Sequence, residues 1–377
     1  MRNHNLLLVT CGLAALLLLT VSVSGCGPGQ VAWSRVIDLG GDDVAAGLAG
    51  NGTHLAALAT VGTDSGPAWL VLKFEPDGRE LWRRQYRQGE ASIAGDVAID
   101  ARGIIYATGS GRVEGREMCL AVCYRPDGAI LWQRALAVGD ACWGRGIALG
   151  ADRVYVCGRV RDGERDEVFV AALTLDGRTE FTRNWRPGRD AGGERLALAP
   201  DSGLVLVGTV GGAENPDILV AKLTPQGDTV WTRTYDGGGE DVPGGVAADQ
   251  YGHVLATGTA LTPEGPRCVI IEHQPDGELI RRTAYGGRVT AEGRAIAVTE
   301  QGDVFVAGTL TGAGRSMLSF QYRPGATSTW ERNWRPGSDA DAAALVVDGD
   351  VYALGTVEQG RGGRDVALVR FVRPDAE

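Results

Sequence analysis

The chain has 377 residues, of which 44% are apolar, 22% are charged and 57 are glycine. So large an apolar fraction excludes a disordered chain, and glycines without a triplet spacing exclude a collagen helix. The formal net charge is −10, Lys73 and Lys222 are the only lysines, and no cluster of four or more basic residues occurs along the sequence, which disfavours nucleic acid or an anionic membrane surface as a partner. A mostly β protein punctuated by glycine remains.

The first predicted element is a targeting segment. A short polar start precedes an apolar run over 6–23, which is the layout of a secretory signal. The sequence Val23-Ser24-Gly25-Cys26 resembles the bacterial lipobox, and this resemblance implies that Cys26 becomes the acylated first residue of the mature chain. An uncleaved signal anchor is the alternative, because the apolar run is also long enough to span a bilayer.

These residues set the expected domains and location. We expect a lipoprotein signal peptide over 1–25, a lipidated tether over 26–31 and a folded unit over 32–377. Since two or more acyl chains give a stable anchor, the protein is expected outside the cytoplasm, bound to the membrane through Cys26. Gly27, where an aspartate would signal inner-membrane retention in some bacteria, favours the outer membrane if the organism has one.

An extracytoplasmic location permits disulfides, so the five other cysteines of the expected mature chain need an interpretation. They are Cys119, Cys123, Cys142, Cys157 and Cys268, and none has the spacing of a metal site. Cys119 and Cys123 lie about 13 Å apart on one predicted strand and cannot pair. We expect most of the five to be small buried apolar side chains, with a Cys142–Cys157 bridge as the alternative.

A hairpin signal of the Pro-Asp-Gly type recurs through the rest of the chain. Proline presets φ, aspartate bonds to its own backbone and glycine takes the positive φ, so each copy predicts a tight turn. The copies begin at Pro76, Pro126, Leu175, Pro225, Pro275, Pro324 and Pro374. Six residues after the first six of these stand Trp82, Trp132, Phe181, Trp231, Arg281 and Trp330, and Trp33 precedes the first turn. The period of 49 or 50 residues predicts a repeat architecture.

Each period holds four short predicted strands, which in the fourth copy cover roughly 193–199, 203–209, 216–224 and 229–235. Four strands repeated seven times predict an all-β fold, a single seven-bladed β-propeller of four-stranded blades. A lone fourth strand over 32–38 begins the unit and a third strand over 364–372 ends it. We therefore expect the N-terminal strand to complete the last blade and close the ring. Two stacked sandwich domains are the alternative, although no linker divides the chain.

The repeat resembles the bacterial seven-bladed β-propeller repeat family over nearly all of 31–377. The best copy is Asp217-Ile-Leu-Val-Ala-Lys-Leu-Thr-Pro-Gln-Gly-Asp-Thr-Val-Trp231. The stretch Asp77-Gly-Arg-Glu-Leu-Trp82 is also similar to quinoprotein-type propeller repeats, but those proteins usually have eight blades. The resemblance implies a fold and implies no common catalytic residues.

The sequence presents no catalytic constellation. His54, His253 and His273 are isolated, and the nucleophile-elbow, zinc-protease and phosphate-loop motifs are missing. This favours a non-enzymatic scaffold that binds an envelope protein or polysaccharide. A glycan-active hydrolase or lyase using channel-mouth carboxylates is the alternative.

The longer loops alternate onto one face, where binding usually resides on a rigid scaffold. The predicted binding rim there consists of Asp42, Asp43, Asp140, Trp143, Asp190, Glu240, Asp241, Asp339 and Asp341. Glu90 and Glu292 extend this acidic ring, and Arg145, Arg189 and Arg288 interrupt it.

Several uses of this rim remain open. Trp143 is the expected exposed aromatic contact, whereas Trp185 belongs to a packing column. The carboxylates can be solvated polar turns, a docking face for a basic partner or a Ca²⁺ site. No other cofactor is expected, and the protein is expected to be a monomer.

Overall fold

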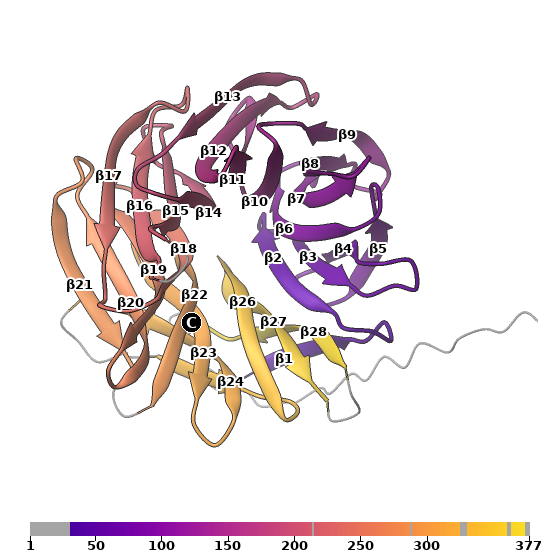
Figure 1. The fold of residues 1–377 in the computed structure, drawn as a ribbon. Coiled ribbons are helices and arrows are strands. Elements are labelled where there is room, and N and C mark those ends of the chain that lie inside the picture. Colours follow the sequence, from indigo (N-terminus) through magenta and orange to yellow (C-terminus); the bar gives the residue numbers. More distant parts are fainter. Residues whose placement is uncertain (1–30, 213–214, 287–288, 325–329, 360–362, 374–377) are drawn as a thin grey trace, which may run out of the picture.

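In the computed structural model, the described residues are 31–212, 215–286, 289–324, 330–359 and 363–373. They form seven antiparallel sheets of four strands each, arranged as blades around a central axis (Figure 1). The predicted single seven-bladed β-propeller is confirmed. Within these residues, no helix is long and apolar enough to cross a membrane. The predicted signal peptide and Cys26 lie outside the described part of the chain.

The blades follow one another in chain order. Blades 1 and 2 are β2 (Val44–Gly50), β3 (Leu55–Val61), β4 (Ala68–Phe74), β5 (Glu80–Tyr86) and β6 (Ser92–Ile99), β7 (Ile105–Val113), β8 (Arg116–Tyr124), β9 (Ile130–Leu136). Blades 3 and 4 are β10 (Ala141–Leu149), β11 (Arg153–Asp162), β12 (Arg165–Thr174), β13 (Thr179–Trp185) and β14 (Ala191–Leu198), β15 (Leu204–Val210), β16 (Asp217–Leu223), β17 (Thr229–Tyr235). Blades 5 and 6 are β18 (Asp241–Ala248), β19 (Val254–Thr262), β20 (Gly265–His273), β21 (Leu279–Tyr285) and β22 (Thr290–Val298), β23 (Val304–Thr311), β24 (Arg315–Tyr322), β25 (Glu331–Trp334). Blade 7 is β26 (Asp339–Asp348), β27 (Asp350–Glu358), β28 (Arg364–Phe371) and β1 (Val31–Ile37).

The ring closes as the sequence predicts. β1 pairs antiparallel with β28, with Val31 opposite Phe371 and Ile37 opposite Val366 (Figure 1). The N-terminal strand therefore supplies the outermost strand of blade 7, and the pairing removes an open sheet edge.

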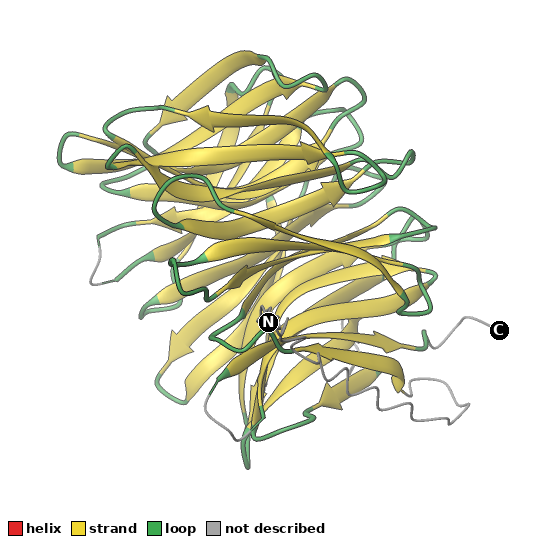
Figure 2. Ribbon diagram, turned by 90° about the vertical axis from the view of Figure 1, so that its right-hand side faces the viewer, coloured by secondary structure: helices red, strands yellow, loops and turns green. Residues whose placement is uncertain are grey.

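The two ends of the channel differ. The Pro-Asp-Gly turns lie on one face, which we call the turn face. The blade-to-blade loops and the loops between second and third strands lie on the opposite face, which we call the mouth face. Figure 2 shows the blades from the side, with loops at both ends of the strands. This alternation follows from the antiparallel order within every blade and agrees with the predicted sorting of the loops.

Neighbouring blades are joined by a repeated contact that we call the latch. The indole N–H of Trp33 donates to the carbonyl oxygen of Pro76 in the next blade at 3.1 Å, and Arg35 Nε donates to the carbonyl oxygen of Gly78 at 3.1 Å. The same pair of bonds recurs at the blade 1–2, 2–3 and 4–5 junctions, from Trp82 and Arg84, from Trp132 and Arg134, and from Trp231 and Arg233. The tryptophan column therefore has the predicted packing role, and its contacts join each blade to the next one.

The core lies between adjacent sheets, where their apolar faces meet. All five described cysteines are buried there as free thiols, so the alternative Cys142–Cys157 bridge does not form. A hydrogen bond to Cys119 and burial both raise the pKa of the Cys142 thiol, which keeps it neutral.

Candidate functional site: an arginine-lined channel mouth

The innermost strand of every blade carries a β-bulge at the same point, where a bulge can re-aim a side chain toward the axis. In β10, β14 and β22 the residue at the bulge is charged, namely Arg145, Glu194 and Arg294. In the other four blades it is alanine or glycine. Small residues suit the crowded axis, because a Cβ on Gly95 would lie 3.0 Å from the carbonyl oxygens of residues 144 and 145. The three charged exceptions therefore need a separate explanation.

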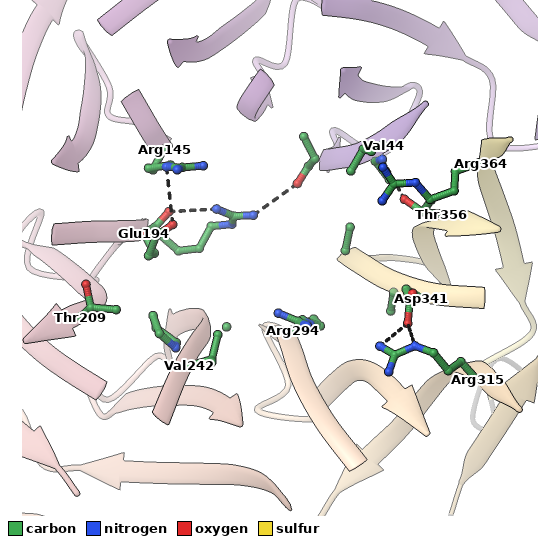
Figure 3. A pocket seen from close by; sticks show the side chains of 17 residues that line it. Val44, Arg145, Glu194, Thr209, Val242, Arg294, Arg315, Asp341, Thr356 and Arg364 are labelled. Atoms are coloured by element: carbon green, nitrogen blue, oxygen red, sulfur yellow. Dashed lines mark hydrogen bonds and ion pairs between the residues drawn. The ribbon is translucent and has the colours of Figure 1, made fainter. Parts of the chain in front are cut away.

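These side chains open into a cavity of about 490 Å³ on the mouth face (Figure 3). The charged residues that line it are Arg145, Glu194, Arg195, Arg294, Arg315, Asp341 and Arg364. Five guanidinium groups and two carboxylates thus share one hollow at the end of the channel.

Two of the arginines form no close ion pair with a carboxylate of the described residues. Arg145 Nε lies 3.9 Å from Glu194 Oε2, at the limit of an ion pair. Arg195 donates to backbone carbonyls instead, from Nη1 to Glu194 at 2.9 Å and from Nη2 to Ala46 across the channel at 3.3 Å. Figure 3 shows this chain of contacts spanning the cavity from Arg145 to β2.

The other side of the cavity is an ion-pair network. Glu292 accepts from Arg294 at 2.6 Å and from Arg315 at 3.1 Å, and Arg315 also pairs with Asp341 at 2.6 Å. Burial alone would raise the pKa of the Glu292 carboxyl, but its bonds to Arg315 and the charge of Arg294 hold that pKa below its usual value. The network fixes two guanidinium groups in the cavity wall.

Of the nine residues of the predicted rim, only Asp341 lines this cavity. Asp42, Asp140 and Glu240 are exposed on loops of the mouth face, and Asp190 and Asp339 are half-buried there. Asp43 and Asp241 are fully buried at blade junctions. The charged side chains of the mouth are therefore mainly arginines, and the predicted carboxylates lie mostly outside it.

Trp143 is half-buried beneath two arginines of the neighbouring strand. The guanidinium carbons of Arg159 and Arg161 lie 4.7 and 5.6 Å from its ring centroid. Both arginines also line a second cavity of about 310 Å³, together with Asp166 and Asp190. The aromatic face of Trp143 is thus engaged with cations of its own blade.

Sequence reasoning missed Glu194, Arg195, Arg294, Arg315 and Arg364 as cavity residues. A signal for two of them exists in the repeat, since Glu194 and Arg294 occupy the bulge column that is otherwise alanine or glycine apart from Arg145. Arg315 and Arg364 begin third strands, and only the closed ring brings them to the mouth.

The polar groups of the lining are guanidinium groups, two carboxylates and two threonine hydroxyls. Among its described residues are no histidine, tyrosine, lysine, serine or cysteine. Of its two threonines, Thr356 accepts the backbone N–H of Ala45 at 3.0 Å and so braces blade 7 against blade 1. A guanidinium group presents a planar fork of donors that fits carboxylate, sulfate or phosphate oxygens.

Several solved structures are similar to this chain in fold. A puromycin hydrolase has a TM-score of 0.56 at 16% identity, and the match covers 86% of this chain and 51% of the hydrolase. This chain therefore spans about half the length of the hydrolase. The polysaccharide lyase Uly1 has a TM-score of 0.55 at 10% identity, with coverage of 86% and 88%. The β-propeller domain of the Trilobed protease from Pyrococcus furiosus, described as having an open velcro topology, has a TM-score of 0.52 at 11% identity, with coverage of 87% and 93%.

The shared feature is the fold. Identities this low establish the propeller architecture and nothing about activity. No protein-family model matches the sequence, and no curated protein shows significant sequence similarity to it.

Proposed function

We propose that this chain is a non-enzymatic, lipid-anchored propeller of the cell envelope that binds an anionic protein or polymer at its channel mouth. The convergence of five arginines on one cavity carries the proposal. The anchor is the acylated Cys26, the protein is a monomer, and the repeat belongs with the bacterial seven-bladed propeller repeats.

The electrostatics support an anionic group as the ligand. Arg145 and Arg294 are about two-fifths exposed at the side chain, so a ligand can reach them from the mouth face. The exposed carboxylates of the surrounding loops would repel a flat anionic surface, so they favour a narrow anionic chain or chain end that can enter the cavity.

The test is a binding measurement with fluorescent polygalacturonate and polyglutamate, with neutral dextran as the uncharged probe. We expect the full chain to bind one or both polyanions, and Arg145→Gln and Arg294→Gln each to weaken binding roughly 10-fold or more, since a hydrogen bond to a charged group contributes about 1.5–3 kcal/mol. Arg178→Gln is the matched control, because Arg178 is exposed and paired with Asp176 on the turn face. Equal weakening by the control, or no binding of either polyanion, would refute the proposal.

Glycan cleavage by channel-mouth carboxylates is tested on the same samples. Glu194 and Asp341 are the carboxylates that line the cavity, so they are the groups such a reaction would use. Polygalacturonate that shortens with the wild-type chain, but not with Glu194→Gln or Asp341→Asn, would replace the binding proposal with an enzymatic one.

A further inference from the structure

Three carboxylates meet at the junction between blades 4 and 5, and none of them lines the arginine-lined cavity, although Asp241 directly precedes Val242 of its wall. They belong to Asp217 at the start of β16, Asp236 after β17 and Asp241 at the start of β18, and we call them the Asp241 triad. One carboxylate oxygen from each lies within 4.8 Å of the other two. Ca²⁺ binds oxygen ligands at 2.3–2.6 Å, so ligands of one ion lie at most about 5 Å apart.

One member of this triad is buried to a degree that is unusual for a free carboxylate, whereas Asp217 is half-buried and Asp236 is exposed. Asp241 is fully buried, and its Oδ2 accepts the backbone N–H of Gly237 at 2.6 Å. Its Oδ1 and the Oδ1 of Asp217 are buried and have no hydrogen-bond partner among the described residues. No described arginine, lysine or histidine forms an ion pair with any of the three. A buried, unpaired carboxylate beside two others is costly unless a cation neutralises it.

The repeat supplies an independent comparison, because each position of the triad has an equivalent at every junction. The position of Asp241 is held elsewhere by Ser92, Cys142, Ala191, Ala291, Ala340 and Asp43. The fold therefore needs only a small buried residue there. Asp43 is the one other aspartate in this series, at the junction between blades 7 and 1.

At that second junction the other two positions are also aspartate. Asp38 corresponds to Asp236 and Asp365 corresponds to Asp217, and we call these residues the Asp43 triad. Asp43 is fully buried, its Oδ2 accepts the backbone N–H of Leu39 at 3.3 Å, and its Oδ1 is buried without a hydrogen-bond partner among the described residues. Among the described residues, the Asp241 triad alone brings one carboxylate oxygen from each of three side chains within 4.8 Å of one another, so the Asp43 triad shares its repeat positions but not this close spacing.

The five other junctions show no such set. The positions of Asp217 and Asp236 hold Ala68 with Arg87, Met118 with Ala137, Glu167 with Arg186, Arg267 with Gly286, and Ser316 with Arg335. The single acid among them, Glu167, forms an ion pair with Arg186. At each junction, the three positions are either all aspartate or never all acidic. One ligand shared by three carboxylates would produce this pattern.

We propose that the Asp241 triad is a Ca²⁺ site that joins blade 4 to blade 5, and that the Asp43 triad, at the same positions of the repeat, binds a second Ca²⁺ between blade 7 and blade 1. Each site would draw one carboxylate from a third strand, one from a blade-to-blade loop and one from the next innermost strand. The bound ion would neutralise the buried aspartate and tie two blades together. This assignment does not depend on the ligand proposed for the channel mouth.

The first test is Ca²⁺ titration calorimetry on the full chain in detergent after treatment with EDTA. We expect the wild-type chain to bind two Ca²⁺, Asp241→Ala and Asp43→Ala to bind one each, and the double variant to bind none. Alanine is suitable because Ala191, Ala291 and Ala340 occupy the same position at other junctions. Glu167→Gln is the control, because Glu167 is the equivalent of Asp217 at a junction without a triad. This variant should still bind two Ca²⁺.

The second test is thermal unfolding of the same proteins. Saturating Ca²⁺ should raise the melting temperature of the wild-type chain by about 5 °C, each single variant should lose about half of that shift, and the double variant all of it. Without Ca²⁺, Asp241→Ala should melt above the wild type, because the substitution removes a buried unpaired charge. Asp236→Asn and Asp38→Asn alter exposed members of the two triads, and each should also remove one site.

Four results would overturn the proposal. They are a wild-type chain that binds no Ca²⁺ at millimolar concentrations, a single aspartate variant that keeps both sites, a Glu167→Gln variant that loses one, and equal affinity for Mg²⁺.

Discussion

His273 stands at a position that the other six blades fill with apolar or aromatic side chains. Its equivalents at the end of the third strand are Phe74, Tyr124, Leu173, Leu223, Tyr322 and Phe371. The imidazole is 4% exposed, its Nδ1 has no hydrogen-bond partner among the described residues, and its ring lies 5.6 Å from that of Trp231. Burial, together with the charges of Arg233 and Arg282, lowers its pKa to about 4.

This histidine predicts a loss of stability in mild acid. Between its folded pKa of about 4 and its ordinary value of 6.5, the unfolded chain binds a proton that the folded chain does not. The stability linked to this site is therefore complete above about pH 6.5 and falls as the pH drops toward 4, by about 3 kcal/mol over the whole interval. His273→Leu should remove this component, because leucine already occupies the position in blades 3 and 4. Urea unfolding of the wild type and of His273→Leu at pH 7 and pH 4.5 measures this component. If the difference in unfolding free energy between the two proteins does not change with pH, protonation of His273 is not its source.

The latch is the element that gives the repeat its most visible sequence signal. Gly78 takes a φ of +85°, and a Cβ at this position would lie 2.9 Å from the ring of Trp33. Glycine here therefore serves two purposes, a positive φ in the turn and space for an indole from the preceding blade. The same approach recurs at Gly128, Gly177 and Gly277 against the tryptophans of their preceding blades.

Gly78→Ala should accordingly destabilise the propeller by more than its backbone strain. Gly302 is the matched control, since it has a φ of +86° in another turn of the turn face but has open space around the position of a Cβ. We expect Gly302→Ala to cost about 1 kcal/mol from the positive φ, and Gly78→Ala to cost at least about 2 kcal/mol, since Trp33 must also shift. Denaturant unfolding of the two variants gives the difference, and equal costs would mean that the latch contributes nothing.

The sequence predicts elements well because its signals are local. Turn chemistry, strand alternation and the period locate the strands of the fourth copy to within two residues, from Ala191–Leu198 to Thr229–Tyr235. The bond from Trp33 to Pro76 joins residues 43 apart, and periodicity alone does not say whether an aromatic column packs within its own blade or against the next. The cavity is harder to predict from the sequence, because Arg145 and Arg364 come to line the same cavity only after the ring has closed.

For the molecule as a whole, the course of β1 relates the proposed anchor to the proposed binding site. β1 begins opposite Phe371 at the turn face and ends at Ile37, next to the loop that enters blade 1 on the mouth face. Residue 26 precedes Val31 by only five positions, a reach of at most about 18 Å in extended chain. An acylated Cys26 would therefore hold the turn face toward the membrane and leave the arginine-lined cavity directed away from it.

This orientation predicts how anchoring affects binding. Cys26→Ala should move the protein from the membrane to the soluble fraction, and a wild-type chain that is already soluble would refute the lipid anchor. The acylated chain in neutral vesicles should bind polygalacturonate or polyglutamate with the same affinity as the soluble variant, because the bilayer does not cover the mouth face. Arg145→Gln should weaken binding equally in both forms. Binding that is strong in the soluble variant but lost on vesicles would instead place the mouth against the bilayer, which a tether of five residues from the turn face does not allow.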